Sequence, residues 1–299
     1  MQAKKAWRQV DGVLLLDKSS GMTSNDALQK ARRLFSAAKG GHTGTLDPLA
    51  SGLLPLCFGE ATKFAADLLD ADKTYEATLQ LGATTDTHDA EGTVLATRPV
   101  HCGEAEIRAV LPRFCGPILQ VPPMYSALKR DGRPLYELAR QGVEVERQPR
   151  QVTIQAIDVL EFAGTTVRLR VRCSKGTYIR VLAADLGEAL GCGAHLAALR
   201  RTAVGPLELA GAPTLDTIAS LPEADRPGCL APVDALLGSL PRVDLEGSPA
   251  ERFRHGNPVE SPIVAAGRLR VYEGGRLIGI GEIDAGRKLW PKRLVQLPV

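Results

Sequence analysis

Hydrophobic and polar positions divide the first part of the chain into alternating strand-like and helix-like segments. The apolar run 12–16 predicts a buried strand, and Thr23-Ser-Asn-Asp26 is typical of a helix capping box. Apolar residues then recur at helical spacing and predict a helix that ends near Lys39. A second helical segment is expected from about Pro48 to Leu69, broken near 55–59.

The middle of the chain mixes both periodicities. Strict alternation over 74–82 predicts a strand with one wet face. Residues 104–114 fit a short amphipathic helix, and 152–160 and 165–173 alternate again and are expected to pair. The segment 178–190 predicts a helix that stops at a glycine. Because there is no regular βαβ rhythm, we expect the α+β class.

The remaining segments indicate an excursion, a connection and a separate module. Residues 121–150 are basic and punctuated by Pro and Gly, with one short helix near 135–140. Residues 211–242 fit a long connection. Beyond Pro241, short strands over 268–273, 276–283 and 293–297 predict a small C-terminal β-barrel. We therefore divide the chain into domains 1–240 and 241–299.

Composition narrows the class of protein. The chain has 299 residues, of which 44% are hydrophobic and 24% charged, as in ordinary soluble proteins. No apolar run reaches the roughly 18 residues that span a bilayer, and the N-terminus lacks the apolar stretch of a signal peptide. The six cysteines contain no C-x-x-C pair, which disfavours a disulfide framework or a zinc site. We expect a cytoplasmic protein with reduced thiols and no metal.

Charge distribution says more than the net charge of +3. Three segments are strongly basic: 1–40 carries a net charge of +5, 163–181 carries +5, and 267–299 carries +4. Basic clusters on a nearly neutral chain indicate a face that binds a polyanion. A merely solvated charged surface is the alternative at this point.

The most informative loop is Gly41-His-Thr-Gly-Thr-Leu-Asp47-Pro-Leu-Ala-Ser-Gly52. One interpretation is structural, with Asp47 as N-cap and Pro48 as the first residue of a helix. The other is functional, with an exposed glycine-rich loop that holds His42 and Asp47 in a cleft and lets a ligand approach the backbone. The two interpretations are compatible.

Arg180 lies in the first turn of the helix predicted over 178–190, where the helix dipole disfavours a cation. A carboxylate partner would explain its position. A bidentate pair would keep that carboxylate ionised in a dry pocket by lowering its pKa. Simple exposure of Arg180 to solvent is the alternative.

Four other candidates have equally ordinary alternatives. Tyr75 and Tyr178 fit either core positions or rings that stack on a nucleobase. His42 is more often a surface or hydrogen-bonding histidine than a catalyst, and Leu199 is most simply a core leucine.

Five ordered motifs resemble those of the TruB family of bacterial tRNA pseudouridine synthases. The resemblance is close over 12–210 and looser in the C-terminal module. The motifs are Gly12-Val-Leu-Leu-Leu-Asp-Lys18, the loop Gly41–Gly52, Asp72-Lys-Thr-Tyr75, Val121-Pro-Pro-Met-Tyr-Ser-Ala-Leu-Lys129 and Cys173-Ser-Lys-Gly-Thr-Tyr-Ile-Arg180.

The resemblance implies an α+β fold with a mixed, largely antiparallel sheet flanked by helices and loops, plus a C-terminal PUA-like barrel. It implies isomerisation of uridine 55 in the T-loop of tRNA to pseudouridine, by base flipping and without cofactor or metal. The implied partners are the T-arm and the acceptor stem of tRNA, bound by a monomer.

The resemblance also assigns residues. Asp47 matches the aspartate that attacks the nucleotide, Arg180 the arginine paired with it, and Tyr75 the tyrosine that stacks on the uracil. Attack on the sugar, attack on the base and a glycal route all stay open, as does proton transfer by Tyr75. His42 matches a histidine that fills space in the T-loop, and Tyr178 and Leu199 match substrate-pocket positions. Residues 123–151 match a mobile thumb that closes on RNA.

The chemistry fits this assignment. The reaction needs one activated carboxylate, a pocket for the detached base and exclusion of water. A glycoside hydrolase would want two facing carboxylates, and only Asp47 stands out in the motif loops. Two rivals stay open: a non-catalytic RNA-binding or tRNA-folding protein, and a glycosylase that releases free uracil.

Overall fold

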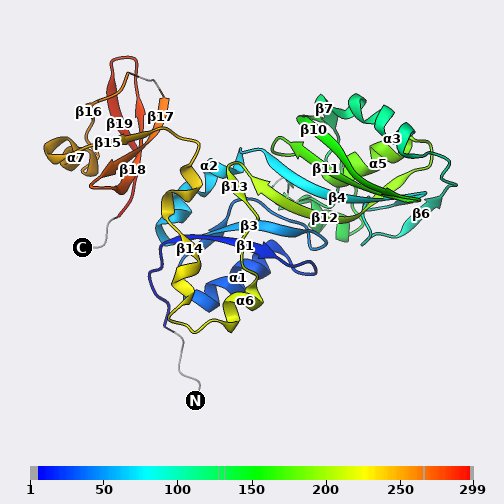
Figure 1. Cartoon of the computed structure of the whole chain (residues 1–299), viewed down its shortest axis with the longest axis horizontal. Coiled ribbons are helices and arrows are strands. Elements are labelled where there is room, and N and C mark those ends of the chain that lie inside the picture. The colour runs from blue at the N-terminus through cyan, green and yellow to red at the C-terminus, as the bar shows by residue number, and fades with distance from the viewer. Residues whose placement is uncertain (1–5, 127, 131, 265–266, 297–299) are drawn as a thin grey trace.

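The computed structural model describes residues 6–126, 128–130, 132–264 and 267–296. Residues 1–5 of the basic N-terminal segment therefore lie outside the described part of the chain. Within it, the chain builds a large ten-stranded sheet and a separate five-stranded sheet from the C-terminal region (Figure 1). No helix in these ranges is both long and apolar enough to cross a membrane.

The large sheet is almost entirely antiparallel. The exception is the short parallel contact between β12 and β3. Two strands pair beside the main path, β13 with β12 and β2 with β3. In spatial order the strands are β14 (Leu230–Ala231), β1 (Gly12–Lys18), β3 (Ser51–Phe58), β12 (Ala194–Val204), β4 (Lys73–Leu81), β11 (Thr166–Cys173), β10 (Arg150–Ala163) and β7 (Gly116–Gln120), with β13 (Leu207–Glu208) and β2 (Gly40–His42) at the side.

Helices cover this sheet in two groups (Figure 1). Helices α1 and α6 lie beside β1 and β3, whereas α5 packs on β12 and β4. This mixture confirms the α+β class. The helices and the two small hairpins are α1 (Ser24–Phe35), η1 (Gly59–Phe64), α2 (Ala65–Leu69), α3 (Glu104–Val110), η2 (Leu111–Phe114), α4 (Leu135–Arg140), α5 (Ile179–Ala189), α6 (Leu215–Ser220), η3 (Arg226–Cys229), η4 (Val233–Leu237), α7 (Gly247–Arg254), β5 (Ala83–Thr85) with β6 (Val94–Thr97), and β8 (Lys129–Arg130) with β9 (Arg133–Pro134).

The capping box predicted for the first helix is confirmed. Asp26 N–H donates to the Thr23 hydroxyl, and the Asp26 carboxylate accepts from Thr23 N–H. The helix ends at Phe35 rather than near Lys39. Ser36 takes a left-handed φ of 54°, and its N–H bonds to the carbonyls of the last turn, which closes the helix early.

The helix expected over 48–69 is wrong for its first half. Residues Ser51–Phe58 form β3, which pairs with β1 along one edge and with β12 and β2 along the other, and whose alternate side chains are buried in two different apolar clusters, one on each face. A strand covered on both faces gives a continuous apolar run without strand periodicity, so the pattern misled. Pro55 is tolerated because β3 pairs with β12 at Ser51 and Gly52 and with β2 only from Leu56 onwards.

The other predicted elements of this region are confirmed. Strand β4 covers 74–81, β10 pairs antiparallel with β11, and α4 spans Leu135–Arg140 within the basic excursion. Helix α5 begins at Ile179, which places Arg180 in its first turn as expected.

The C-terminal sheet is small and curled. Its order is β15 (Arg242–Asp244), β17 (Gly267–Glu273), β18 (Arg276–Ile283), β19 (Lys288–Leu294) and β16 (Val259–Glu260). The strands predicted over 268–273 and 276–283 are confirmed. The third begins at Lys288 instead of Arg293, because Pro291 is accommodated at a register shift between β18 and β19. Residue 297, its predicted end, lies outside the described residues.

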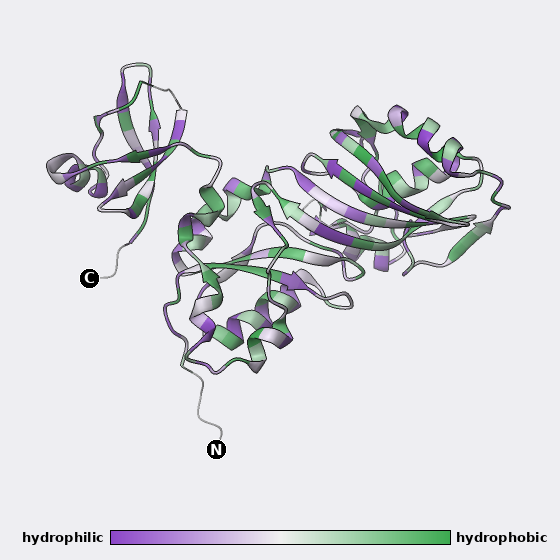
Figure 2. Cartoon of the chain, in the orientation of Figure 1, coloured by the Kyte–Doolittle hydropathy of each residue, from purple (hydrophilic) through white to green (hydrophobic). Residues whose placement is uncertain are grey.

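One apolar cluster joins the two sheets. Tyr272, Leu277 and Ile280 of the C-terminal sheet pack with Val13 and Leu53 of the large sheet and with the buried leucines of η4. Figure 2 shows hydrophobic residues along β1 and β3, whereas α1 alternates hydrophobic and hydrophilic residues. The C-terminal sheet therefore completes part of the core next to the strands that carry the candidate site.

Candidate active site

Asp47 lies in a turn between β2 and β3. The carbonyl of Asp47 accepts a bond of 3.0 Å from Ala50 N–H, and no helix begins there, so the predicted N-cap role is wrong. The Ser24 hydroxyl donates to the Leu46 carbonyl and accepts from Leu46 N–H, at 3.0 and 2.8 Å. These bonds tie the loop to the start of α1 and hold Asp47 in place.

The predicted pair between Asp47 and Arg180 is present. Arg180 Nε lies 2.9 Å from Asp47 Oδ2, and the Arg180 side chain is only 5% exposed whereas that of Asp47 is 39% exposed. Asp47 and Arg180 do not form the bidentate pair that the sequence predicts. Arg180 Nη1 lies 3.4 Å from Asp89 Oδ2, and its other donors bond to the carbonyls of Thr87 and Tyr125. The guanidinium is therefore shared between two carboxylates.

The direction expected for the pKa shift of Asp47 is wrong, chiefly because the carboxyl is buried. Burial raises the pKa of the Asp47 carboxyl, and the nearby Asp89 charge raises it further. The Arg180 and Lys18 charges lower the pKa, but burial is the larger effect. Asp47 is consequently a carboxylate whose ionisation depends on its cationic neighbours.

Asp89 is the residue that the sequence analysis missed. It is 3% exposed, and its Oδ1 accepts from the Thr87 hydroxyl at 2.6 Å and from Glu91 N–H at 3.1 Å. His88, between these residues, has a left-handed φ of 60°. The run Thr84-Thr-Asp-Thr-His-Asp89 after β4, rich in acids and hydroxyls, was the available signal.

One cavity of about 250 Å³ brings most candidates together. Asp47, Tyr75, Tyr178, Arg180 and Leu199 all line it. Burial raises the pKa values of the Tyr75 and Tyr178 hydroxyls, so both rings are neutral at neutral pH. The cavity thus presents a carboxylate beside aromatic and aliphatic walls, which suits a small flat ring.

His42 lies in a wider neighbouring cavity of about 770 Å³, which shares Asp47 and Arg180 with the smaller one. Its Nδ1 is buried and has no hydrogen-bond partner among the residues that the structure describes. Burial and the Arg201 charge lower the pKa of His42, so the ring is neutral at neutral pH. Tyr136 and Arg140 of the basic excursion line the same cavity.

Two buried cations also stand near Asp47. Lys18 is 0% exposed and donates from Nζ to the carbonyls of Ser19 and Met22. Arg201 is 1% exposed and lines the smaller cavity. Burial lowers the pKa of Lys18 to about 8.

This arrangement favours nucleophilic over two-carboxylate chemistry. Asp89 is held by hydrogen bonds and its side chain is 4% exposed, so it presents no second reacting carboxylate to a ligand. Among the described residues that line the smaller cavity, Asp47 is the one acidic side chain, and it is partly exposed; of the two cavities, Asp86 and Glu91 line only the wider one. The groups present fit attack by one carboxylate on a bound ring or sugar.

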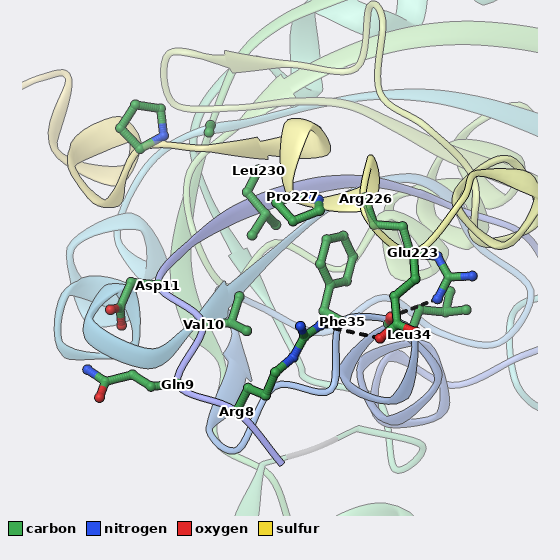
Figure 3. A pocket seen from close by; sticks show the side chains of 12 residues that line it. Arg8, Gln9, Val10, Asp11, Leu34, Phe35, Glu223, Arg226, Pro227 and Leu230 are labelled. Carbon is green, nitrogen blue, oxygen red and sulfur yellow. Dashed lines mark hydrogen bonds and ion pairs between the residues drawn. The ribbon is translucent and has the colours of Figure 1, made fainter. Parts of the chain in front are cut away.

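A separate hollow lies between the N-terminal segment, the end of α1 and residues 223–232 (Figure 3). An ion pair of 3.3 Å between Arg8 and Glu223 crosses it. None of the predicted site residues lines this hollow.

Three family models match successive parts of the chain. The N-terminal domain of TruB family pseudouridylate synthases matches residues 32–179. A C-terminal domain of tRNA pseudouridylate synthase B matches residues 180–238, and the C-terminal region of pseudouridine synthase II TruB matches residues 241–295.

Curated relatives and solved structures agree with these matches. The chain is 71% identical over 297 residues to tRNA pseudouridine synthase B of Dechloromonas aromatica (strain RCB), which covers 99% of both chains. It is 58% identical over 295 residues to the protein of the same name from Azoarcus sp. (strain BH72), covering 99% of this chain and 98% of that one. A Cbf5-Nop10-Gar1 complex contains a chain with a TM-score of 0.72 at 28% identity, covering 95% of this chain and 84% of that one. With this identity along almost its whole length, the chain belongs to the TruB family of tRNA pseudouridine synthases.

Proposed function

We propose that the chain isomerises uridine 55 of tRNA to pseudouridine, with Asp47 as the attacking carboxylate. The bond between uracil N1 and ribose C1′ breaks, C5 of the same uracil bonds to C1′, and one proton leaves C5 while one is gained at N1. Any bond that Asp47 forms to the nucleotide breaks again in the second step, which regenerates the free carboxylate. The observation that carries the proposal is the partly exposed Asp47 carboxylate, 2.9 Å from Arg180 on the wall of a small cavity.

The cavity residues receive roles from their positions. Arg180 holds Asp47 and opposes the effect of burial on its ionisation, and Asp89 positions Arg180 from the other side. The Tyr75 ring stacks on the uracil, and Tyr178 and Leu199 close the walls around it. Together these rings and Leu199 restrict the access of water to the opened glycosidic bond once the base is bound.

The wider cavity takes the RNA around the flipped nucleotide. Extruding a base costs a few kcal/mol. Two kinds of contact offset this cost, one that fills the space left in the base stack and one to the RNA backbone. We assign the first contact to neutral His42. Residues 123–151 act as the thumb, since Tyr136 and Arg140 of α4 line the same cavity and carry an aromatic ring and a cation to it.

We further propose how the rest of the molecule contributes. Residues 1–240 form the catalytic domain, and residues 241–299 form an RNA-binding domain that takes the acceptor stem while the catalytic domain takes the T-arm. The enzyme acts in the cytoplasm as a monomer.

One experiment separates this function from its rivals. The purified chain is incubated with an unmodified tRNA T-arm stem-loop, and the RNA is analysed by chemical labelling specific for pseudouridine, because isomerisation leaves the mass unchanged. Labelling at position 55 supports the proposal. Free uracil would indicate a glycosylase, and binding without either product would indicate a non-catalytic RNA-binding protein.

A further inference from the structure

Arg201 is a buried cation whose hydrogen bonds are incomplete. Its Nε donates to the Leu53 carbonyl at 2.8 Å, whereas its Nη2 is buried without any partner in the described part of the chain. The side chain is 1% exposed and lines the cavity that contains Asp47 and Tyr75. An unpartnered buried donor costs free energy, and because the Arg201 side chain borders the cavity, a ligand there can interact favourably with its charge.

The charge of Arg201 is also uncommitted. Arg180 is neutralised by Asp47 and Asp89, but Arg201 forms no ion pair among the described residues. Its charge acts on the groups around the cavity: it adds to the burial that lowers the pKa values of His42 and Lys18, and with its hydrogen bond to Tyr75 it partly offsets the burial that raises the pKa of Tyr75. The cavity therefore holds positive charge that no protein carboxylate balances.

The backbone fixes where this guanidinium lies. Arg201 is opposite Tyr75 on one neighbouring strand and opposite Gly52 on the other. A β-carbon on Gly52 would come within 2.3 Å of the Arg201 carbonyl oxygen, so the glycine permits a close approach of β3 to β12. Arg201 is thus held beside Tyr75, whose ring we propose to stack on the uracil.

We infer that Arg201 is a catalytic residue that stabilises the negative charge on the uracil after it leaves the sugar. When the bond between C1′ and N1 breaks, its electron pair stays on the base, and the charge spreads over N1 and the carbonyl oxygens. When C5 then attacks C1′, the electron pair of the base forms the C5–C1′ bond, and any bond between Asp47 and the nucleotide breaks so that Asp47 leaves as a carboxylate. C5 then loses its proton and N1 gains one. A fixed cation at the base lowers the energy of this intermediate without reorganising. The inference rests on the proposed function.

The test compares Arg201→Met with Arg200→Met. Arg200 is the next residue of the same strand, is paired with Asp17 on the opposite face and lines neither cavity beside Asp47. Each variant is assayed in single turnover on tRNA that carries either uridine or 5-fluorouridine at position 55. The quantity measured is the rate at which that original nucleoside disappears. Fluorine stabilises the anion of the base, so the need for the cation is smaller with 5-fluorouridine.

We expect Arg201→Met to lose about 10²–10³-fold in rate with uridine, the effect of removing one donor from an oxyanion site. With 5-fluorouridine we expect the loss in rate to be at least about tenfold smaller than with uridine, because the fluorinated anion needs less stabilisation by the cation. The Arg200→Met rates stay within about threefold of wild type. Equal losses with both substrates would overturn the inference, because a structural role does not depend on the leaving base.

A second variant covers the case in which Arg201→Met does not fold. Arg201→Lys keeps the charge but not the planar fork, so its rates fall between those of wild type and Arg201→Met, again with a smaller loss for 5-fluorouridine. Equal losses in this variant also overturn the inference. Wild-type enzyme that forms no pseudouridine would instead contradict the proposed function itself.

Discussion

At the scale of single residues, the site depends on one cation shared by two acids. Arg180 contacts Asp47 at 2.9 Å and Asp89 at 3.4 Å, and the carbonyls of Thr87 and Tyr125 take its other donors. Asp47 is the more exposed of the two acids, so it is the one that a substrate can reach. The Arg180 charge opposes the burial that raises the pKa of the Asp47 carboxyl, and the Asp89 charge adds to that rise.

Replacing Asp47 by Asn removes the charge with little change of shape. We expect pseudouridine formation to fall by at least about 10³-fold, as for loss of a nucleophile. Binding of tRNA stays within about threefold, because phosphate contacts dominate the affinity. Release of tritium from 5-tritiated uridine measures the first quantity and filter binding the second. Turnover near that of wild type in purified Asp47→Asn would refute the nucleophile role.

Replacing Arg180 by Lys keeps the charge and loses the fork. A single ammonium group cannot bond to Asp47, Asp89 and two carbonyls at the same geometry. We expect a loss of about 10²-fold or more in single-turnover rate, the scale of one misplaced catalytic group. Arg168→Lys, on an exposed face of β11, is the matched control. Near-normal activity of Arg180→Lys would argue against the ion pair as the element that holds Asp47.

The pH dependence follows from the raised pKa of Asp47. In the proposed mechanism only the ionised Asp47 attacks, so we expect activity to fall as the pH drops through this pKa, with the acid limb of the rate profile above the ordinary range of aspartate. The Asp89 charge raises the pKa of Asp47, so Asp89→Asn moves the limb to lower pH even as it lowers the plateau. Single-turnover rates from pH 4 to 8, with circular dichroism to confirm folding, measure both. A limb that stays in place in Asp89→Asn would contradict this coupling.

At the scale of elements, the site is assembled where β3 and β12 run close together. Gly52 has a φ of 97° and lies directly against the backbone of Arg201. This contact brings the Asp47 loop, at the start of β3, next to the strand that carries Leu199 and Arg201. The geometry of two strands therefore sets the geometry of the cavity.

Gly52→Ala should disturb this contact. The added β-carbon would lie 2.3 Å from the Arg201 carbonyl oxygen, at a φ that alanine disfavours. We expect a loss of roughly 2–4 kcal/mol in the free energy of unfolding, from strain and steric displacement. Gly41→Ala is the control, because nothing lies within 4 Å of its β-carbon. Urea denaturation compares the two variants, and equal stabilities would show that the close approach is not needed.

Local signals predicted local structure well. The capping box of α1, the alternation of β4 and the short helix α4 depend on neighbouring residues, and all three are confirmed. Strand β3 was misread because its apolar run reflects burial by other elements, which no local pattern records.

For the candidate site too, the sequence identified what local motifs carry and missed what depends on the fold. The motif residues Asp47, Tyr75 and Arg180 were identified and do lie together. Asp89 was missed, and the pKa direction of Asp47 was wrong, because both depend on a third residue brought in by the fold.

At the scale of the whole molecule, the two sheets share more than the apolar cluster. Lys63 of η1 donates to the Leu294 carbonyl at 3.0 Å, and Glu60 accepts from Gln296 N–H at 2.7 Å. The Tyr272 hydroxyl bonds to Asp234, and Arg268 pairs with Asp67. The polar contacts thus fix the C-terminal region to η1, α2 and η4, and the apolar cluster fixes it to β1 and β3 of the large sheet.

Binding of tRNA should depend steeply on salt. The basic clusters over 1–40, 163–181 and 267–299 lie on a chain of net charge +3, so affinity comes from local contacts to phosphates. With each contact adding about −0.7 to −0.9 to the slope of log affinity against log salt, we expect a slope steeper than about −3. The rate at saturating tRNA stays constant over the same range. Titration by fluorescence anisotropy from 50 to 300 mM KCl measures the slope, and a value near zero would contradict a phosphate-binding face.

The shared apolar cluster has a consequence for how this architecture can change over evolution. Tyr272, Leu277 and Ile280 cover leucines that the catalytic sheet leaves open. A descendant that lost or exchanged its last sixty or so residues would expose an apolar surface on the rest of the protein. Such a lineage would need polar replacements at these positions before the rest of the chain could remain stable alone. We therefore expect the C-terminal sheet and the large sheet to be inherited together.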